Sequence, residues 1–263
     1  MEYTAYAQFA EQVLIPKANE VLKKYYDAHC AGQDIDIQTK TDESPASIAD
    51  REAEKQLRAL IKLQFPHHGI WGEEFGGEDL DSEYVWVLDP LDGTKQFLAQ
   101  QEGCFVVLIG LFRDKKPIWG VASDPISKEI WIDRMQIEAP IRKALSQMVI
   151  ACTAPDSMFK GKAQEASILK LLDGALEVKQ FLNAKSFLSV INGNVDVAIE
   201  SDLSLHDIGA LIPICQAAGC VMTDFEGNDY TQKKYEFNTD KYDFLVTRNN
   251  ETSNKILEII RQK

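Results

Sequence analysis

Two aspartates within the hexapeptide Asp89-Pro90-Leu91-Asp92-Gly93-Thr94 follow directly after an apolar run, and a Gly-Glu-Glu triplet at residues 72–74 precedes them. We expect Pro90 to end the strand formed by that run and to fix a turn, so that both carboxylates point into one pocket. Gly93 allows the backbone to approach a ligand closely, and a helix that begins at Gly93-Thr94 would offer free N–H groups to an anion. The pattern therefore predicts carboxylate ligands for a cation beside a seat for a phosphate group.

Two further acidic residues, Asp50 and Asp207, stand at the expected starts of helices. Taken singly, each fits a helix cap, while the Gly-Glu-Glu triplet fits a solvated loop and the hexapeptide fits an acidic turn. The carboxylates that could share one pocket are those of Glu73, Asp89, Asp92 and Asp207. Together they would carry a charge of about −4, which is too repulsive to gather without cations. Two or three Mg²⁺ ions bound there would turn the cluster into a receptor for a phosphate ester.

The overall composition narrows the class of protein and its partners. The 263 residues include 28 Lys and Arg against 41 Asp and Glu, and the net charge of −13 argues against a nucleic-acid partner, which needs a basic surface. No apolar run approaches the roughly 20 residues of a membrane-spanning helix, and residues 1–12 lack the basic start and apolar core of a signal peptide. We therefore expect a cytoplasmic globular protein with reduced cysteines, no membrane partner, and a small phosphorylated metabolite as its ligand.

The elements that must position these residues follow from apolar periodicity and from helix and strand breakers. Helices are expected at residues 2–26, from Ser47 or Asp50 onward, at 162–172, up to Leu188, from about Asp207 and from Glu251. Strands are expected at residues 84–89, 104–112, 117–123, 129–132, 148–152, 176–181, 195–200, 220–225 and 244–247, with a Gly-rich turn at 69–84. Pro16 predicts a kink in the first helix, and Pro213 predicts a kink or a late start in the helix near Asp207. This order indicates two tightly joined halves, residues 1–140 and 141–263.

From about Thr41 to Asp229 the chain resembles the inositol monophosphatase family of metal-dependent, lithium-sensitive phosphatases. The Gly-Glu-Glu triplet, the hexapeptide and the late His-Asp-Ile-Gly-Ala-Leu segment carry the resemblance, and their combination is highly specific. Several details are more similar to the histidinol-phosphatase branch than to the inositol branch; they are Ser44-Pro45, residues 49–54 and 65–69, Lys95, residues 154–156 and 158–159, and residues 211–213. The resemblance implies an α+β fold, a layered α-β-α-β-α sandwich of the inositol monophosphatase type, which usually forms a homodimer.

The resemblance also implies which residues hold the metal ions. Glu73, Asp89 and the carbonyl of Leu91 would hold a first Mg²⁺. Asp89 would also bind a second Mg²⁺, together with Asp92 and Asp207. The first half of the chain would thus carry most of the metal ligands, and the second half would carry Asp207 with the segments that read the substrate.

The catalytic and substrate-binding roles that the resemblance implies fall on five residues. Asp50 would act through water on a third, weaker metal ion and help to orient the nucleophilic water, which Thr94 would position. The N–H groups of Gly93 and Thr94 would hold the phosphate, and Asp207 would also face the substrate. A water activated by metal would then attack phosphorus in line, with Glu73 or the Thr94–Asp50 pair orienting it.

The chain departs from the family pattern at three places. His206 stands where the family often has Trp. A single histidine of this kind is usually a packing or surface residue. Gln216 replaces an acidic residue that is frequent in the histidinol-phosphatase branch, and Asn183-Ala184 replaces an Asp-Cys pair. The missing acid would weaken recognition of a cationic substrate, so the departures bear on substrate choice and not on metal chemistry.

These observations favour a Mg²⁺-dependent phosphomonoesterase with L-histidinol phosphate as the lead substrate. The alternatives are an inositol-1-monophosphatase or a phosphatase of broader sugar and nucleotide phosphates. A non-catalytic member that binds metal or a phosphorylated metabolite is a more distant alternative. A phosphatase that forms an aspartyl-phosphate is disfavoured, because two residues separate Asp89 from Asp92 where that chemistry uses one, and because the Gly-Glu-Glu triplet would have no role.

Overall fold

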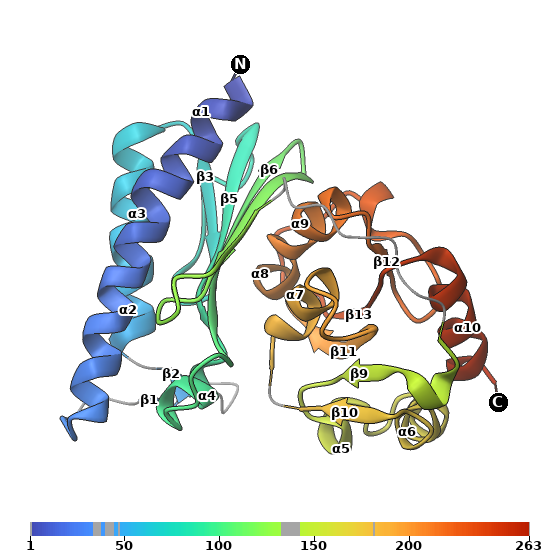
Figure 1. Cartoon of the computed structure of the whole chain (residues 1–263). Helices are drawn as coiled ribbons and strands as arrows, with labels where there is room; N and C mark the ends of the chain where they lie inside the picture. Colours follow the sequence, from blue (N-terminus) through green and yellow to red (C-terminus); the bar gives the residue numbers. More distant parts are fainter. Residues whose placement is uncertain are drawn as a thin grey trace.

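Two β-sheets and three layers of helices are stacked in the order helix, sheet, helix, sheet, helix (Figure 1). The computed structural model describes residues 2–33, 38–39, 45–46, 48–132, 143–180 and 182–262. This arrangement confirms the predicted α+β class and its five layers. The predicted boundary between two halves at residue 140 lies outside the described residues, as does Ser47 as a helix start.

The first helical layer packs on the outer face of the first sheet. Its elements are α1 (Glu2–Phe9), a π-helical turn (Ala10–Leu14), α2 (Ile15–Cys30) and α3 (Ile48–Gln64). Pro16 lies in the first turn of α2, directly after the π-helical turn. Because proline lacks an N–H and its ring collides with the preceding turn of an α-helix, a break in the regular α-helical pattern directly before it is expected, and the π-helical turn provides this break. The kink itself stays a prediction.

The first sheet has the strand order β4-β3-β5-β6-β7-β8. Its strands are β3 (Gly69–Gly72), β4 (Gly76–Glu78), β5 (Tyr84–Asp92), β6 (Val106–Arg113), β7 (Lys116–Ser123) and β8 (Ile130–Ile132). The prediction of a turn throughout residues 69–84 was wrong, since β3 and β4 lie within it. Glycine obscured the pattern because the backbones pack closely there: a Cβ on Gly69 would lie 2.4 Å from the carbonyl oxygen of Asp79.

The strand β5 does not end at Pro90, and that prediction was also wrong. The strand continues to Asp92 with a shift in register, pairing Asp89 with Leu108 and Asp92 with Val106. Three residue steps on β5 therefore oppose two on β6, which is a β-bulge. A bulge leaves one residue outside the ladder, so proline can occupy it without the loss of a pairing N–H.

The second sheet has the order β10-β9-β11-β13-β12, with helices on both faces (Figure 1). Its strands are β9 (Val149–Ala151), β10 (Glu177–Lys179), β11 (Val197–Leu203), β12 (Val221–Thr223) and β13 (Tyr242–Thr247). The helices between the sheets are α7 (Lys185–Ile191), α8 (Leu205–Ile208) and α9 (Leu211–Ala217), and those outside are α5 (Pro155–Met158), α6 (Glu165–Asp173) and α10 (Asn250–Ile260). Helix α9 starts anew three residues after α8 ends, which confirms the late start predicted from Pro213.

Short elements complete the described chain: the strands β1 (Gln38–Thr39) and β2 (Pro45–Ala46), the helix α4 (Thr94–Leu98), and the 3₁₀ turns Leu145–Gln147 and Tyr230–Gln232. Three buried apolar clusters fill the spaces between successive layers. Of the helices in the described ranges, none has the combined length and apolarity that a bilayer crossing demands. The largest cluster lies between the two sheets and fixes how α8 faces β5.

Candidate active site

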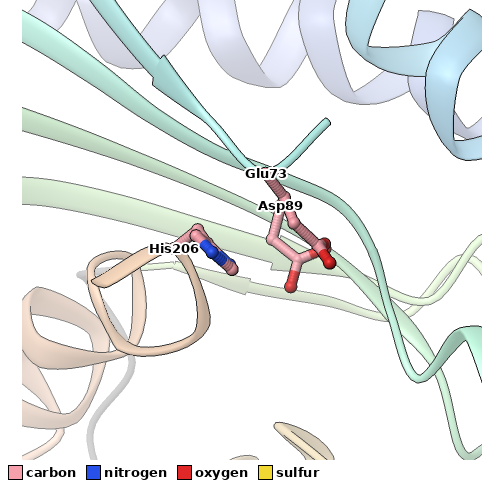
Figure 2. A group of neighbouring side chains, drawn as sticks. All are labelled: Glu73, Asp89 and His206. Carbon is pink, nitrogen blue, oxygen red and sulfur yellow. The ribbon is translucent and has the colours of Figure 1, made fainter. Parts of the chain in front are cut away.

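Acidic side chains from opposite layers meet at the end of β5. Asp89 and Asp92 lie on β5, Glu73 follows β3, and Asp207 lies on α8. Two overlapping groups of potential ligands share Asp89: one is Glu73, Asp89 and His206, and the other is Asp89, Asp92 and Asp207. Within each group, one ligand atom from each residue lies within 4.8 Å of the others. The structure thus brings together the four carboxylates named from the sequence, and it adds His206 to them. Figure 2 shows His206 with Glu73 and Asp89.

The loop that carries Glu73 is held by a buried carboxylate on α3. Glu54 is fully buried, and its Oε2 accepts the backbone N–H of Glu74 at 2.7 Å, while Oε1 accepts the N–H of Phe75 at 3.2 Å. The N–H of Glu73 itself donates to the carbonyl oxygen of Leu88 at 3.1 Å. These three hydrogen bonds fix the backbone at Glu73 and directly after it.

Glu54 is in turn fixed by its neighbours. Arg58, one helical turn later, donates from Nε to Glu54 Oε1 at 2.7 Å. A Cβ on Gly72 would lie 2.1 Å from that same oxygen, so only glycine leaves room for the carboxylate. Glu54 was not predicted to have a role. An acidic side chain on the apolar face of a helix was the feature of the sequence that could have indicated one.

The hexapeptide forms its own hydrogen bonds at the bulge. Asp89 Oδ1 accepts the N–H of Leu91 at 3.0 Å, and Thr94 Oγ1 donates to the carbonyl oxygen of Leu91 at 3.2 Å. Asp92 Oδ2 accepts the N–H of Ala184 at 2.6 Å, which ties β5 to the start of α7. These bonds fix the two aspartates so that a carboxylate oxygen of each lies within 4.8 Å of the other.

Gly93 caps the short helix α4 in a left-handed conformation, with φ of 94°. A Cβ at this position would lie 2.6 Å from the carbonyl oxygen of Cys104 and 2.8 Å from Asn183 Nδ2. Both the positive φ and the close approach therefore require glycine. The helix begins at Thr94, which meets the condition stated for an anion seat at Gly93 and Thr94.

Asp207 is positioned by the first turn of α8. Its Oδ2 accepts the N–H of Ser204 at 2.5 Å in a capping box, and Lys241 Nζ donates to Ser204 Oγ at 2.7 Å. His206 Nδ1 lies 3.5 Å from Asp207 Oδ1. The Asp207 side chain thus caps α8 and also belongs to the acidic cluster.

The four carboxylates repel one another. Burial, followed by the charges of Glu73, Asp92 and Asp207, holds the pKa of Asp89 well above its usual range. Burial and the charge of Asp207 likewise raise the pKa of Asp92. Burial also acts to raise the pKa of Asp207, but His206 and the Ser204 N–H outweigh it and lower the pKa. An all-oxygen, strongly negative donor set of this kind fits hard divalent cations.

Asp50 lies in the first turn of α3 and is fully buried. Among the residues that the structure describes, neither group of potential metal ligands includes it. Its action through water on a third ion, and its pairing with Thr94, stay predictions.

A pocket of about 320 Å³ opens beside the acidic cluster. Its lining residues are Asp92, Lys95, Thr153, Ala154, Ser157, Met158, Asn183, Ala184, Phe187, Glu200, Leu203 and Asp207. The pocket therefore adjoins the cluster directly, carries one lysine, and has a size suited to a small metabolite.

Glu200 is a pocket residue that the sequence analysis missed. Its Oε1 accepts the hydroxyl of Thr153 at 2.7 Å, and Thr153 Oγ1 accepts the N–H of Asn183 at 2.9 Å. Burial outweighs these hydrogen bonds and raises the pKa of Glu200 to about 8. An acidic residue within the apolar run of β11 was the signal that could have revealed it.

The segments predicted to read the substrate differ in position. Asn183 and Ala184 line the pocket, but Gln216 is exposed at the end of α9 and is not among the lining residues in the described part of the chain. The departure at Gln216 therefore does not alter the wall of this pocket.

Comparison with known proteins agrees with this geometry. The model of the inositol monophosphatase family matches residues 2–263. The chain is 33% identical over 228 residues to the bifunctional phosphatase IMPL2 of Arabidopsis thaliana, described as chloroplastic; the alignment covers 82% of this chain and spans only 64% of that protein. It is 29% identical over 227 residues to the histidinol-phosphatase of Mycobacterium tuberculosis, covering 81% and 85% of the two chains. The solved inositol monophosphatase of Zymomonas mobilis superposes with a TM-score of 0.81 at 25% identity, covering 100% of both chains.

Proposed function

The chain belongs to the inositol monophosphatase family, and we propose that it hydrolyses histidinol phosphate. Members of this family are metal-dependent phosphoric monoester hydrolases. Family membership identifies the chain as a phosphoric monoester hydrolase. The choice of substrate is supported by the two-sided character of the pocket. Glu200 offers a carboxyl group, while Met158 and Phe187 offer an apolar wall. An amino group and an imidazole ring match these two sides, whereas a cyclitol presents hydroxyl groups in every direction.

In this proposal the metal ligands are those that the family resemblance implies. Glu73, Asp89 and the carbonyl of Leu91 would hold one divalent cation, and Asp89 would bind a second with Asp92 and Asp207. When bound, such ions lower the pKa of a coordinated water and offset charge on the phosphate and the leaving oxygen. Mg²⁺ is the proposed ion, with two or three per site.

The chain's own groups orient the reactants. Glu73, or Asp50 with Thr94, orients the attacking water and accepts its proton. The N–H groups of Gly93 and Thr94 donate to equatorial phosphate oxygens, and Lys95 adds positive charge at the pocket wall. No bond between phosphorus and the protein forms in this scheme.

Inositol 1-phosphate is the second candidate substrate, because one observation favours it. With its pKa raised to about 8, Glu200 is largely protonated at neutral pH, and together with Thr153 it can exchange hydrogen bonds with substrate hydroxyl groups. A protonated Glu200 offers less attraction to an ammonium group. The same hydrogen bonds to substrate hydroxyl groups would also support broader activity on sugar or nucleotide phosphates.

A phosphate-release assay tests the proposal. Histidinol phosphate, inositol 1-phosphate, sugar phosphates and 3′-phosphoadenosine 5′-phosphate are compared with Mg²⁺, with and without Li⁺. We expect kcat/KM for histidinol phosphate to exceed the others by at least about tenfold, a difference of roughly 1.4 kcal/mol in transition-state binding. A clear preference for inositol 1-phosphate would reverse the assignment. Metal-dependent ligand binding without release would support a non-catalytic member, and a trapped phosphoryl-aspartate would support the aspartyl-phosphate mechanism.

The same proposal includes a cytoplasmic homodimer without a nucleic-acid or membrane partner. The net charge of −13 supports the absence of nucleic acid. Sedimentation equilibrium of the purified protein tests the dimer: a single species of the monomer's mass at micromolar concentration would refute it.

A further inference from the structure

The histidine that precedes Asp207 faces the acidic cluster. His206 lies on α8, and one of its ring nitrogens lies within 4.8 Å of carboxylate oxygens of Glu73 and Asp89. Figure 2 shows the ring pointing from α8 toward these two carboxylates, which come from the opposite layer. Donor atoms from three separate elements therefore surround one point.

The Nδ1 atom of His206 makes no hydrogen bond within the part of the chain that the structure describes. This atom is buried and lies 3.5 Å from Asp207 Oδ1, beyond normal hydrogen-bond length. Only 17% of the side chain is exposed. A buried nitrogen whose contact with Asp207 is longer than a hydrogen bond is incompletely satisfied, and a bound cation would complete its interactions.

An imidazole nitrogen changes which ion fits the group formed by Glu73, Asp89 and His206. Mg²⁺ takes oxygen ligands, whereas imidazole suits first-row transition ions such as Mn²⁺, Co²⁺ and Zn²⁺. The neighbouring group of Asp89, Asp92 and Asp207 offers oxygen alone. Neutral imidazole also adds a ligand without adding negative charge to a site that already holds two carboxylates.

We propose that His206 is a nitrogen ligand of the ion held by Glu73 and Asp89, and that this position prefers a first-row transition dication to Mg²⁺. The inference rests on the proposed metal centre and goes beyond it, because it makes the two adjacent positions unlike. The position that shares Asp89 with Asp92 and Asp207 keeps its preference for Mg²⁺.

Electron spin echo envelope modulation of the Mn²⁺-loaded full chain tests the inference directly. We expect modulation from a directly bound ¹⁴N nucleus, replaced by the ¹⁵N pattern when the protein contains ¹⁵N-histidine. His206→Phe should abolish the modulation and lower Mn²⁺ affinity by at least about tenfold, while Mg²⁺ affinity changes by less than about threefold. His67→Gln is the matched control, because His67 is exposed and belongs to neither group; it should leave both measurements unchanged.

Stoichiometric Mn²⁺ binding without nitrogen modulation would overturn the inference, and so would modulation that persists in His206→Phe. If that variant does not fold, the isotope experiment on the unaltered chain decides alone, because His206 is the histidine found in the ligand groups of the described residues. Mg²⁺-dependent phosphate release is measured on the same sample. Release without nitrogen coupling refutes the role of His206 alone, whereas absence of both metal binding and release refutes the proposed function.

Discussion

The buried carboxyl groups of Asp89 and Asp92 hold protons more tightly than exposed aspartates do, because burial and neighbouring charges raise the pKa of each. Glu200 adds a third buried acid, with its pKa raised to about 8. In the metal-free protein these groups oppose ionisation, and divalent cations reverse that balance by replacing protons. At the scale of single residues, stability and metal binding are therefore linked.

Asp89→Asn should separate function from stability. The amide can still accept the Leu91 N–H, but it removes a charge shared by both ligand groups. We expect Mg²⁺-dependent kcat/KM to fall by on the order of 10³. In EDTA the Tm should rise, because a repelled buried carboxylate is gone. Asp81→Asn, at an exposed site, is the control and should change neither quantity. Near-normal turnover in Asp89→Asn would disprove the assignment of the metal ligands.

Metal-free stability should fall as pH rises. The pKa of Glu200 is raised from 4.5 to about 8 on folding, so the folded state binds more protons between these values. Its contribution is complete below pH 4.5 and is lost as pH rises through 8, and Asp89 and Asp92 act with the same sign. Thermal unfolding in EDTA from pH 5 to about 8 measures this loss. Stabilisation by Mg²⁺ should grow over the same range. Glu200→Gln should flatten the metal-free slope, and an unchanged slope would count against Glu200 as a cause.

At the scale of elements, the site depends on two irregular features. The bulge in β5 lies between Asp89 and Asp92, whose carboxylates both belong to the acidic cluster. The loop after β3 is held by Glu54 on α3, so a helix in the outer layer fixes the backbone of a cluster residue. Regular elements alone would not bring these side chains together.

Glu54→Gln should disturb that loop. The amide keeps the size of the side chain but leaves Arg58 Nε facing a neutral group and presents an NH₂ to backbone donors. We expect a loss of about 2–4 kcal/mol in unfolding free energy, measured in urea. Mg²⁺ affinity should fall by roughly 10-fold to 100-fold as Glu73 shifts. Glu52→Gln on the same helix, where Glu52 contacts Gln56, should cost less than about 0.5 kcal/mol. Equal effects of the two changes would contradict the loop-holding role.

At the scale of the whole molecule, the cluster joins the two sheets. Glu73, Asp89 and Asp92 come from the first sheet and its loop, and Asp207 comes from the helix layer in front of the second. A buried ion pair links the same two parts: Lys185 at the start of α7 donates to Asp124 Oδ2 at 2.6 Å. Cation binding and this ion pair should both resist separation of the layers.

Lys185→Met should destabilise the whole fold. Among the described residues it leaves Asp124, whose side chain is 2% exposed, with the N–H groups of Ile126 and Ser127 as its side-chain hydrogen-bond donors. We expect about 3 kcal/mol lost in urea unfolding, with both layers unfolding together. Lys115→Met breaks another pair between residues far apart in the chain, Lys115 with Glu236, but that pair is exposed. It should cost less than about 1 kcal/mol. A loss that small in Lys185→Met would show that the buried pair does not hold the layers.

The sequence alone determined most element positions and the four acidic residues of the cluster, because periodicity and residue chemistry are local properties. The class of fold followed from the family resemblance of its motifs. The late start of α9 followed from Pro213, whose effect on a helix is also local. The predicted end of the strand at Pro90 was wrong because the pairing of β5 with β6, which is distant in sequence, continues the strand past Pro90.

Only the tertiary structure decided which side chains face the cluster from the other layers. Glu54 and Glu200 lie 19 and 127 residues from Glu73 along the chain, and their roles arise from packing between layers. His206 was assigned by its sequence to packing or the surface, yet α8 turns it toward Glu73 and Asp89. Such contacts are set by how the layers stack, which no local pattern encodes.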